Sequence, residues 1–124
     1  MRYHNILQID DDPDDTDLFE GVLRTVSKSA YLAINNPLVA LEKLVKGIIR
    51  PDVIVLDVNM PGMSGIDVLA KIKGNENTSG IPVIMFSTSS HGELKTKLSK
   101  LGADKYITKP NSVGELRKII LEEL

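Results

Sequence analysis

Two short, uninterrupted apolar runs constrain the fold of this 124-residue chain more than any other feature. They are DVIVL at residues 52–56 and PVIMF at residues 82–86, and both contain Val and Ile in succession. A strand that is apolar at successive positions is buried on both faces, which is typical of parallel sheets covered by helices. The sequence therefore favours an α/β fold in which these runs form buried strands.

Shorter apolar runs and helical patterns alternate along the rest of the chain, without a repeat or a linker. Further strands are expected at residues 5–9, 31–34 and 105–108. Helices are expected at residues 13–27, 36–47, 65–73, 93–101 and 112–124. Five strand–helix units in succession predict a doubly wound parallel sheet with helices on both faces.

Several predicted helices begin with a capping signal. Asp12 followed by Pro13 is a suitable N-cap and first residue for the first helix. The patterns SHGE at residues 90–93 and SVGE at residues 112–115 are capping boxes, in which Ser and Glu side chains satisfy backbone N–H groups. The first-helix side chains expected to face the core are Leu18, Val22 and Val26.

Polar residues stand where the predicted strands end. They are Asp10 and Asp11 after the first strand, Asp57 after the third, Ser87 and Thr88 after the fourth, and Lys109 after the fifth. In doubly wound sheets, ligands bind at the carboxyl ends of the strands. We therefore expect these acids, hydroxyls and amine to converge on one rim.

The segment QIDDDPDD, residues 8–15, concentrates negative charge, since five of its eight residues are Asp. Like charges this close repel one another and weaken the folded state. In the first turn of a helix, acids offset the helix dipole by roughly 0.3–1 kcal/mol each. We assign that role to Asp12, Asp14 and Asp15, which leaves Asp10 and Asp11 to meet a cation.

A divalent cation would supply the counter-charge that three carboxylates on one rim require. Mg²⁺ takes oxygen ligands, keeps several waters, and binds through a few carboxylates plus a phosphate oxygen. A carboxylate beside a metal and a lysine can attack phosphorus and form an aspartyl phosphate. Mg²⁺ and Lys109 would then stabilise charge on the transferring group. These residues predict phosphoryl transfer to Asp57.

Composition argues against other classes of function. The net charge of −2 and the absence of Trp argue against a nucleic-acid-binding surface. The chain has no Cys, which excludes disulfides and thiol catalysis. No apolar stretch approaches the ~20 residues that span a bilayer, and the first ten residues do not form a signal peptide. We expect a cytoplasmic protein that binds neither nucleic acid nor membrane.

Four motifs together resemble the receiver domain of response regulators in two-component signalling. They are the acidic pair after the first predicted strand, VLDVNMPGMSG (55–65), PVIMFST (82–88) and ADKYITKP (103–110). The resemblance covers residues 1–124 and is to the stand-alone, chemotaxis-regulator-like group. It implies a flavodoxin-like α/β fold with strand order 2-1-3-4-5, one domain, and no output domain. DDPDD with the later STSS also resembles regulators linked to sensor kinases such as phytochromes.

The resemblance implies a role for each residue of the rim. Asp57 would be the phosphoacceptor, and Lys109 would match the invariant lysine, followed by a cis peptide bond. Ser87 would contact the phosphoryl group, with Thr88 as the alternative. Tyr106 would be the aromatic residue whose rotamer follows the phosphorylation state.

The resemblance also implies a magnesium site. Its ligands would be Asp10, Asp11, Asp57 and the backbone carbonyl of Asn59. The run of three aspartates leaves one residue of register open, so the acidic pair is either 10 and 11 or 11 and 12. We prefer the first register because Asp12 then precedes Pro13 as a helix cap.

The function implied is that of a single-domain response regulator. A histidine kinase or phosphotransfer protein would phosphorylate Asp57, and the surface of the fourth helix, fifth strand and fifth helix would switch toward a downstream protein. Such a chain assists its own phosphorylation and dephosphorylation but is not an enzyme, and it would be a monomer or weak homodimer.

Two alternatives are less well supported by the residues. A haloacid-dehalogenase-type phosphatase needs Asp-x-Asp, but Asp57 is followed by Val58 and Asn59. A receiver that only binds partners would have lost the acceptor, an acid or the lysine. None of these is lost here.

Overall fold

Five parallel strands and five helices alternate along the computed structural model, which describes residues 2–88 and 92–124. In chain order they are β1 (Asn5–Ile9), α1 (Pro13–Val26), β2 (Ala30–Ile34), α2 (Pro37–Val45), β3 (Val53–Asp57), α3 (Gly65–Gly74), β4 (Val83–Ser87), α4 (Gly92–Lys100), β5 (Lys105–Thr108) and α5 (Val113–Glu123). The sheet order is β2-β1-β3-β4-β5, and every neighbouring pair is parallel. The predicted α/β class and strand order are confirmed.

Most predicted boundaries lie within one or two residues of the observed ones. The strands β3 and β4 each extend one residue beyond their predicted ends, so Asp57 and Ser87 are their last residues. Asp57 pairs with Phe86, and Ser87 pairs with Thr108. The backbones of two predicted site residues are thus fixed by the sheet itself. The capping box at residues 90–93 lies partly outside the described residues.

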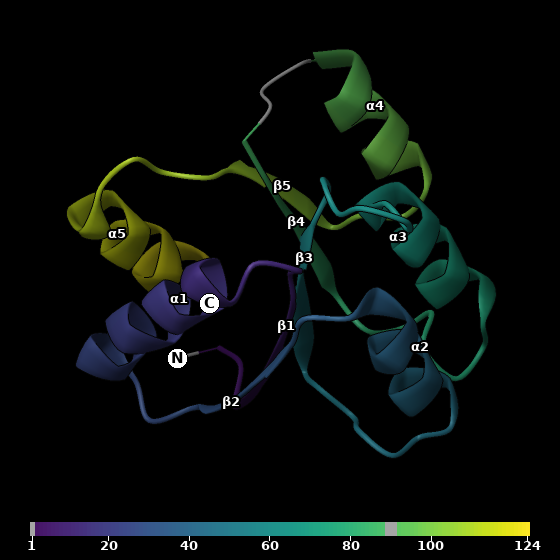
Figure 1. Ribbon diagram of the computed structural model, residues 1–124, viewed down its shortest axis with the longest axis horizontal. Coiled ribbons are helices and arrows are strands. Elements are labelled where there is room, and N and C mark those ends of the chain that lie inside the picture. Colours follow the sequence, from purple (N-terminus) through teal and green to yellow (C-terminus); the bar gives the residue numbers. More distant parts are fainter. Residues whose placement is uncertain (1, 89–91) are drawn as a thin grey trace.

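Two helical layers cover the sheet, with α1 and α5 on one face and α2, α3 and α4 on the other (Figure 1). Side chains of β3 alternate between the two cores: Val53 and Val55 pack toward α1 and α5, whereas Ile54 and Leu56 pack toward the other layer. Every residue of β3 and β4 is buried, as expected for central strands of a parallel sheet. None of the helices in the described ranges has the length and apolar character needed to cross a membrane.

The buried face of α1 differs from the predicted one. Its buried residues are Thr16, Phe19, Val22 and Leu23, whereas Leu18 is 50% exposed. The prediction for Leu18 was wrong because the buried stripe of α1 runs through Thr16 and Phe19, and Leu18 lies outside that stripe. Phe19 instead stacks on Tyr31, with ring centroids 5.9 Å apart.

Helix starts follow the predicted capping chemistry where the chain is described. Asp12 accepts a hydrogen bond from the backbone N–H of Asp14, and Pro13 is the first residue of α1. Ser112 accepts one from the N–H of Glu115 at the start of α5. These caps fix where each helix leaves the rim of the sheet.

Candidate functional site

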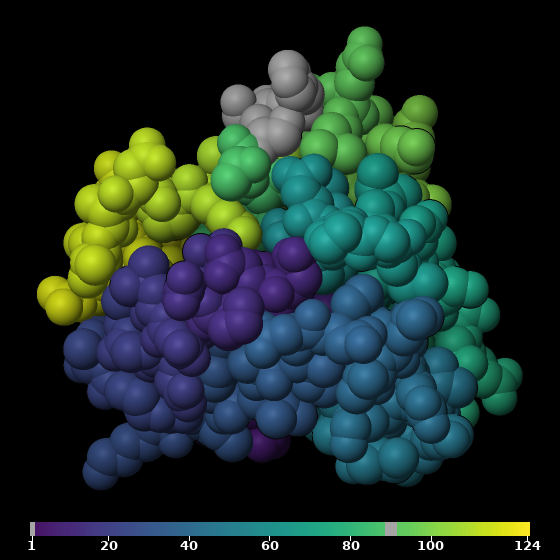
Figure 2. Space-filling model, viewed as in Figure 1, coloured from purple at the N-terminus to yellow at the C-terminus, as the bar shows by residue number. Residues whose placement is uncertain are grey.

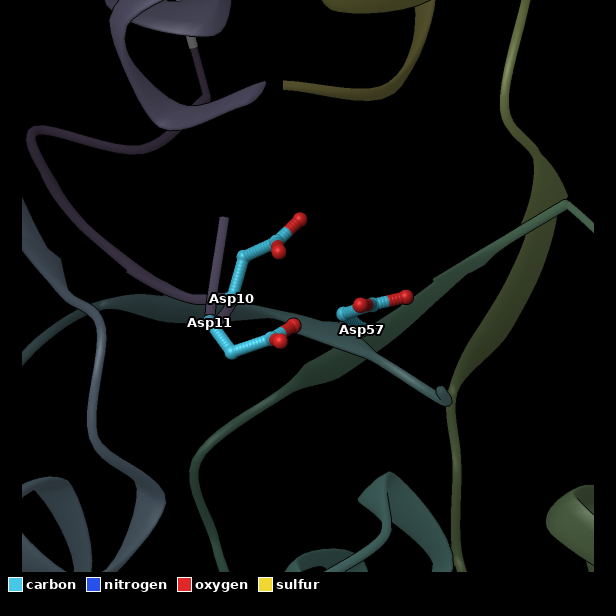
Figure 3. A group of neighbouring side chains, drawn as sticks. All are labelled: Asp10, Asp11 and Asp57. Atoms are coloured by element: carbon cyan, nitrogen blue, oxygen red, sulfur yellow. The ribbon is translucent and has the colours of Figure 1, made fainter. Parts of the chain in front are cut away.

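Three carboxylates meet at the carboxyl ends of β1 and β3, two neighbouring strands (Figure 3). Asp10 and Asp11 follow β1, and Asp57 is the last residue of β3. One oxygen from each of the three carboxylates lies within 4.8 Å of the others. Asp10 and Asp57 are buried, and Asp11 is half-buried. The predicted convergence of these acids is therefore present in the folded chain.

Asp12 stands apart from this cluster. Its side chain is exposed and caps α1 through the N–H of Asp14. The backbone N–H of Asp12 donates instead to Oδ1 of Asp10, at 3.0 Å. The geometry thus favours Asp10 and Asp11 over the alternative register of 11 and 12.

Lys109 brings its ammonium group into contact with three carboxylates. Its Nζ lies 3.0 Å from Oδ2 of Asp10, 3.0 Å from Oδ2 of Asp15 and 3.4 Å from Oδ1 of Asp57. The lysine side chain is only 14% exposed. One largely buried cation therefore compensates the acids that follow β1, begin α1 and end β3, so the fold tolerates the negative charge on this rim.

Two contacts aim Lys109 from the end of β5. Its backbone N–H donates to the carbonyl of Ser87 at 2.6 Å, and its Nζ lies 5.9 Å from the ring centroid of Phe86. The bond between Lys109 and Pro110 is trans, so the cis bond implied by the resemblance is wrong for this structure. The trans form of an X–Pro bond is favoured by about 0.5–1 kcal/mol. The side chain reaches the acids with this trans bond.

Asp15 is the member of this constellation that sequence reasoning missed. We assigned it only to the first turn of α1, where it does lie, but its side chain also pairs with Lys109. Asp15 directly precedes the buried Thr16, whereas Asp14 is exposed. The sequence offered one usable signal: Asp15 lies in the first turn of α1, and this turn begins beside the rim of the sheet.

Burial and charge set the ionisation of the cluster. Burial raises the pKa of Asp10 above its ordinary value, although hydrogen bonds from Asp12 and Lys109 oppose the rise. Burial, and next the charge of Asp10, raise the pKa of Asp57 to about 6. Burial alone would lower the pKa of Lys109, but its hydrogen bonds to Asp15 and Asp10 raise it above its usual range. Such desolvated carboxylates would be stabilised by an added cation.

The family model described as the response regulator receiver domain matches residues 6–121. The chain belongs to this family. The chemotaxis protein CheY-3 of Vibrio cholerae is 32% identical over 113 residues, covering 91% of this chain and 85% of CheY-3. Two curated transcriptional regulatory proteins match over 54% of this chain but only 29% and 28% of their own lengths.

Solved receiver structures share the whole architecture. The phosphorylated cyanobacterial phytochrome response regulator RcpA has a TM-score of 0.83 at 28% identity, covering 94% of this chain and 89% of RcpA. The Mn²⁺-bound form of response regulator Rcp1 has a TM-score of 0.81 at 26% identity, covering 95% and 90%. Receiver domains are signalling modules that interact with histidine kinases and downstream targets, and they generally bind Mg²⁺ at an acidic cluster.

The remaining predicted residues of the receiver site lie around the acids but not all in contact with them. Asn59 is exposed, and its N–H lies 3.4 Å from Oδ1 of Asp57. Ser87 is fully buried at the end of β4, whereas Thr88 is exposed. Tyr106 is half-buried on β5 and packs against the core beneath α2, α3 and α4. Tyr106 thus lies on the face of the sheet that α2, α3 and α4 cover.

Gly65 holds the start of α3 against the backbone at the end of β3. Its N–H donates to the carbonyl of Val58 at 2.9 Å. A Cβ at this position would lie 2.1 Å from the carbonyl oxygen of Asp57 and 2.7 Å from Cα of Val58. Only glycine permits this approach, so Gly65 fixes the backbone from which the Asp57 carboxylate projects.

A polar network on the far side of Asp10 fixes its backbone. The side chain of Asn35 donates to the carbonyl of Asp10 at 2.8 Å and lies 3.4 Å from Oγ1 of Thr16. The hydroxyl of Tyr31 donates to Oε1 of the buried Gln8 at 2.5 Å and also contacts the carbonyl of Thr16. These bonds tie β1, β2 and α1 together behind the site.

Proposed function

We propose that this receiver domain is a cytoplasmic signalling protein that accepts a phosphoryl group on Asp57 in a Mg²⁺-dependent reaction. The donor would be the phosphohistidine of a histidine kinase or a phosphotransfer protein. One observation carries the proposal: the buried Asp57 carboxylate lies beside two further acids and 3.4 Å from the Lys109 ammonium. This arrangement pairs a nucleophile with the charges that phosphoryl transfer requires.

The residues fit a hard divalent cation. The three acids offer oxygen ligands from neighbouring strand ends, and these oxygens lie within 4.8 Å of one another, close enough for small side-chain movements to bring them to one ion. The related Rcp1 has been crystallised with Mn²⁺. Asp10, Asp11 and Asp57 would hold Mg²⁺, and the carbonyl of Asn59 would be a further ligand. When bound, Mg²⁺ would supply positive charge to the phosphoryl oxygens.

The transfer step follows from the chain's own groups. A carboxylate oxygen of Asp57 attacks phosphorus, the new P–O bond forms, and the P–N bond to the donor imidazole breaks with its electron pair on nitrogen. Lys109 donates to a phosphoryl oxygen and offsets the developing charge. The hydroxyl of Ser87, or of Thr88, would bind another oxygen. Hydrolysis of the aspartyl phosphate by water returns Asp57 to a carboxylate.

The output would run through the surface of α4, β5 and α5. Tyr106 lies beside a hollow of about 370 Å³ that is also lined by Lys95 of α4 and Glu123 of α5. This hollow would give the ring room for a second rotamer when Ser87 moves toward the phosphoryl group. The two arrangements would present different surfaces to a downstream protein. We further propose that the protein acts as a monomer or weak homodimer and is not an enzyme.

The first test is the intact-protein mass after incubation with acetyl phosphate and Mg²⁺. We expect one phosphoryl adduct on the wild type, and none on Asp57→Asn or in EDTA. Asp67→Asn, an exposed acid at the start of α3, is the matched control and should be modified like the wild type. Full modification of Asp57→Asn would contradict the proposal.

A further inference from the structure

Asp15 differs from the other acids that contact Lys109. Asp10 and Asp57 belong to the group of carboxylates that could share a metal ion, but Asp15 does not. Asp15 lies on the first turn of α1, and its side chain is 44% exposed. When Asp10 and Asp57 share their charge with a cation, Asp15 remains the carboxylate that is free to hold the lysine.

The distances place Lys109 closer to Asp15 than to the phosphoacceptor. Nζ lies 3.0 Å from Asp15 and 3.4 Å from Asp57. An ammonium group has three donors, and the three carboxylates around Lys109 can occupy all of them. A phosphoryl group on Asp57 would therefore have to compete with an existing partner to receive a hydrogen bond from Lys109.

Several hydrogen bonds support the helical turn that carries Asp15. The Asp12 cap fixes the start of α1, and the neighbouring Thr16 is buried and bonded to the carbonyl of Pro13 at 3.1 Å. The hydroxyl of Tyr31 also contacts the backbone carbonyl of Thr16, at 3.0 Å. The first turn of α1 is thus held by several hydrogen bonds, whereas Lys109 reaches Asp15 through a four-carbon side chain with several rotatable bonds.

We propose that Asp15 is a positioning residue that competes with the phosphoryl group for Lys109. This inference rests on the proposed phosphoacceptor function and adds a determinant of how strongly the phosphorylated state is held. Asp15 draws the ammonium toward α1 in the unphosphorylated protein. Its removal frees Lys109 for the phosphoryl group and stabilises the phosphorylated form.

The test is calorimetric titration with beryllofluoride, a phosphoryl mimic, in the presence of Mg²⁺. Asp15→Asn keeps the size of the side chain, and we expect it to bind the mimic about threefold to fivefold more tightly than the wild type, since a partly exposed ion pair is lost. Asp14→Asn is the matched control because it removes the same charge from the same helical turn at an exposed position. We expect its affinity to remain within twofold of the wild type, about the scale of measurement error.

The same substitution in a Lys109→Met variant separates competition for Lys109 from direct repulsion between the Asp15 charge and the mimic. In Lys109→Met, the Asp15→Asn change should no longer tighten binding, because there is no ammonium to release. Tightening by the same factor in both backgrounds would assign the effect to repulsion and overturn the inference.

The two proposals fail in different ways. A wild type that binds no beryllofluoride at any concentration would overturn the phosphoacceptor function, and the role of Asp15 with it. A wild type that binds, together with an Asp15→Asn variant of equal or weaker affinity, would overturn only the role of Asp15. Thermal unfolding of each variant confirms that the compared proteins are folded.

Discussion

Replacing Asp57 with Asn should stabilise the metal-free fold at neutral pH, although it removes the proposed phosphoacceptor. The side chain is only 7% exposed, and its pKa is raised from an ordinary 3.8 to about 6 by burial and by the charge of Asp10. The folded state therefore disfavours the ionised form that exists at neutral pH. Asn has the same shape, carries no charge, and keeps an oxygen that can accept from Lys109.

The size of the pKa shift determines the expected gain in the free energy of unfolding. At 1.36 kcal/mol per pKa unit, a rise from 3.8 to about 6 corresponds to about 3 kcal/mol. This shift already includes the attraction of Lys109, which opposes the rise, so we expect Asp57→Asn to raise the free energy of unfolding by up to about 3 kcal/mol.

The sign of the pH dependence follows from proton binding. Because the folded pKa is the higher one, folded Asp57 binds more protons than unfolded Asp57 between about pH 4 and pH 6. Below about pH 4, ionised Asp57 does not destabilise the wild type, and above about pH 6 the full cost of burying that charge applies. The advantage of the Asn variant should therefore be largest above about pH 6 and vanish below about pH 4.

Urea unfolding in EDTA at about pH 7.5 and about pH 4 measures this difference. Asp17→Asn, at an exposed position of α1, is the matched control and should show no comparable gain. Added Mg²⁺ should reduce the difference in the free energy of unfolding between the two proteins, because it binds and stabilises the folded wild type. An equal advantage at both pH values, or a loss of stability at neutral pH, would refute the reasoning from burial.

Two further substitutions test the supports of the site. Gly65→Ala should destabilise the fold by about 1–3 kcal/mol, since its Cβ would overlap the backbone of Asp57, and phosphorylation by acetyl phosphate should slow; unchanged urea unfolding would contradict this. Asp12→Ala should lower stability by about 0.5–2 kcal/mol through loss of the α1 cap, with Mg²⁺ affinity by calorimetry nearly unchanged. A large loss of Mg²⁺ affinity would instead favour the 11-and-12 register.

The sheet and its rim could be predicted because both follow from local pattern. Uninterrupted apolar runs predicted the buried strands β3 and β4, and parallel topology brings all carboxyl ends to one edge. The purple segment after β1 accordingly lies between the yellow C-terminal part and the teal middle part of the chain (Figure 2). Asp10, Asp11, Asp57 and Lys109 therefore meet without any need to know side-chain conformations.

What the sequence did not reveal depends on three-dimensional detail. The pairing of Asp15 with Lys109 joins residues 94 positions apart and depends on the rotation of α1 about its axis. The same rotation exposes Leu18, which a helical spacing of apolar residues alone placed in the core. The 0.4 Å by which Lys109 is nearer to Asp15 than to Asp57 has no signature in the sequence.

The site of phosphorylation is the most direct test of the central proposal. The wild type would be incubated with acetyl phosphate and Mg²⁺ and then treated with borohydride, which reduces an aspartyl phosphate to homoserine. Peptide sequencing by mass spectrometry locates that residue. We predict homoserine at position 57 only, dependent on Mg²⁺. Homoserine at position 10, 11 or 15 instead, or equal labelling in EDTA, would contradict Asp57 as the phosphoacceptor.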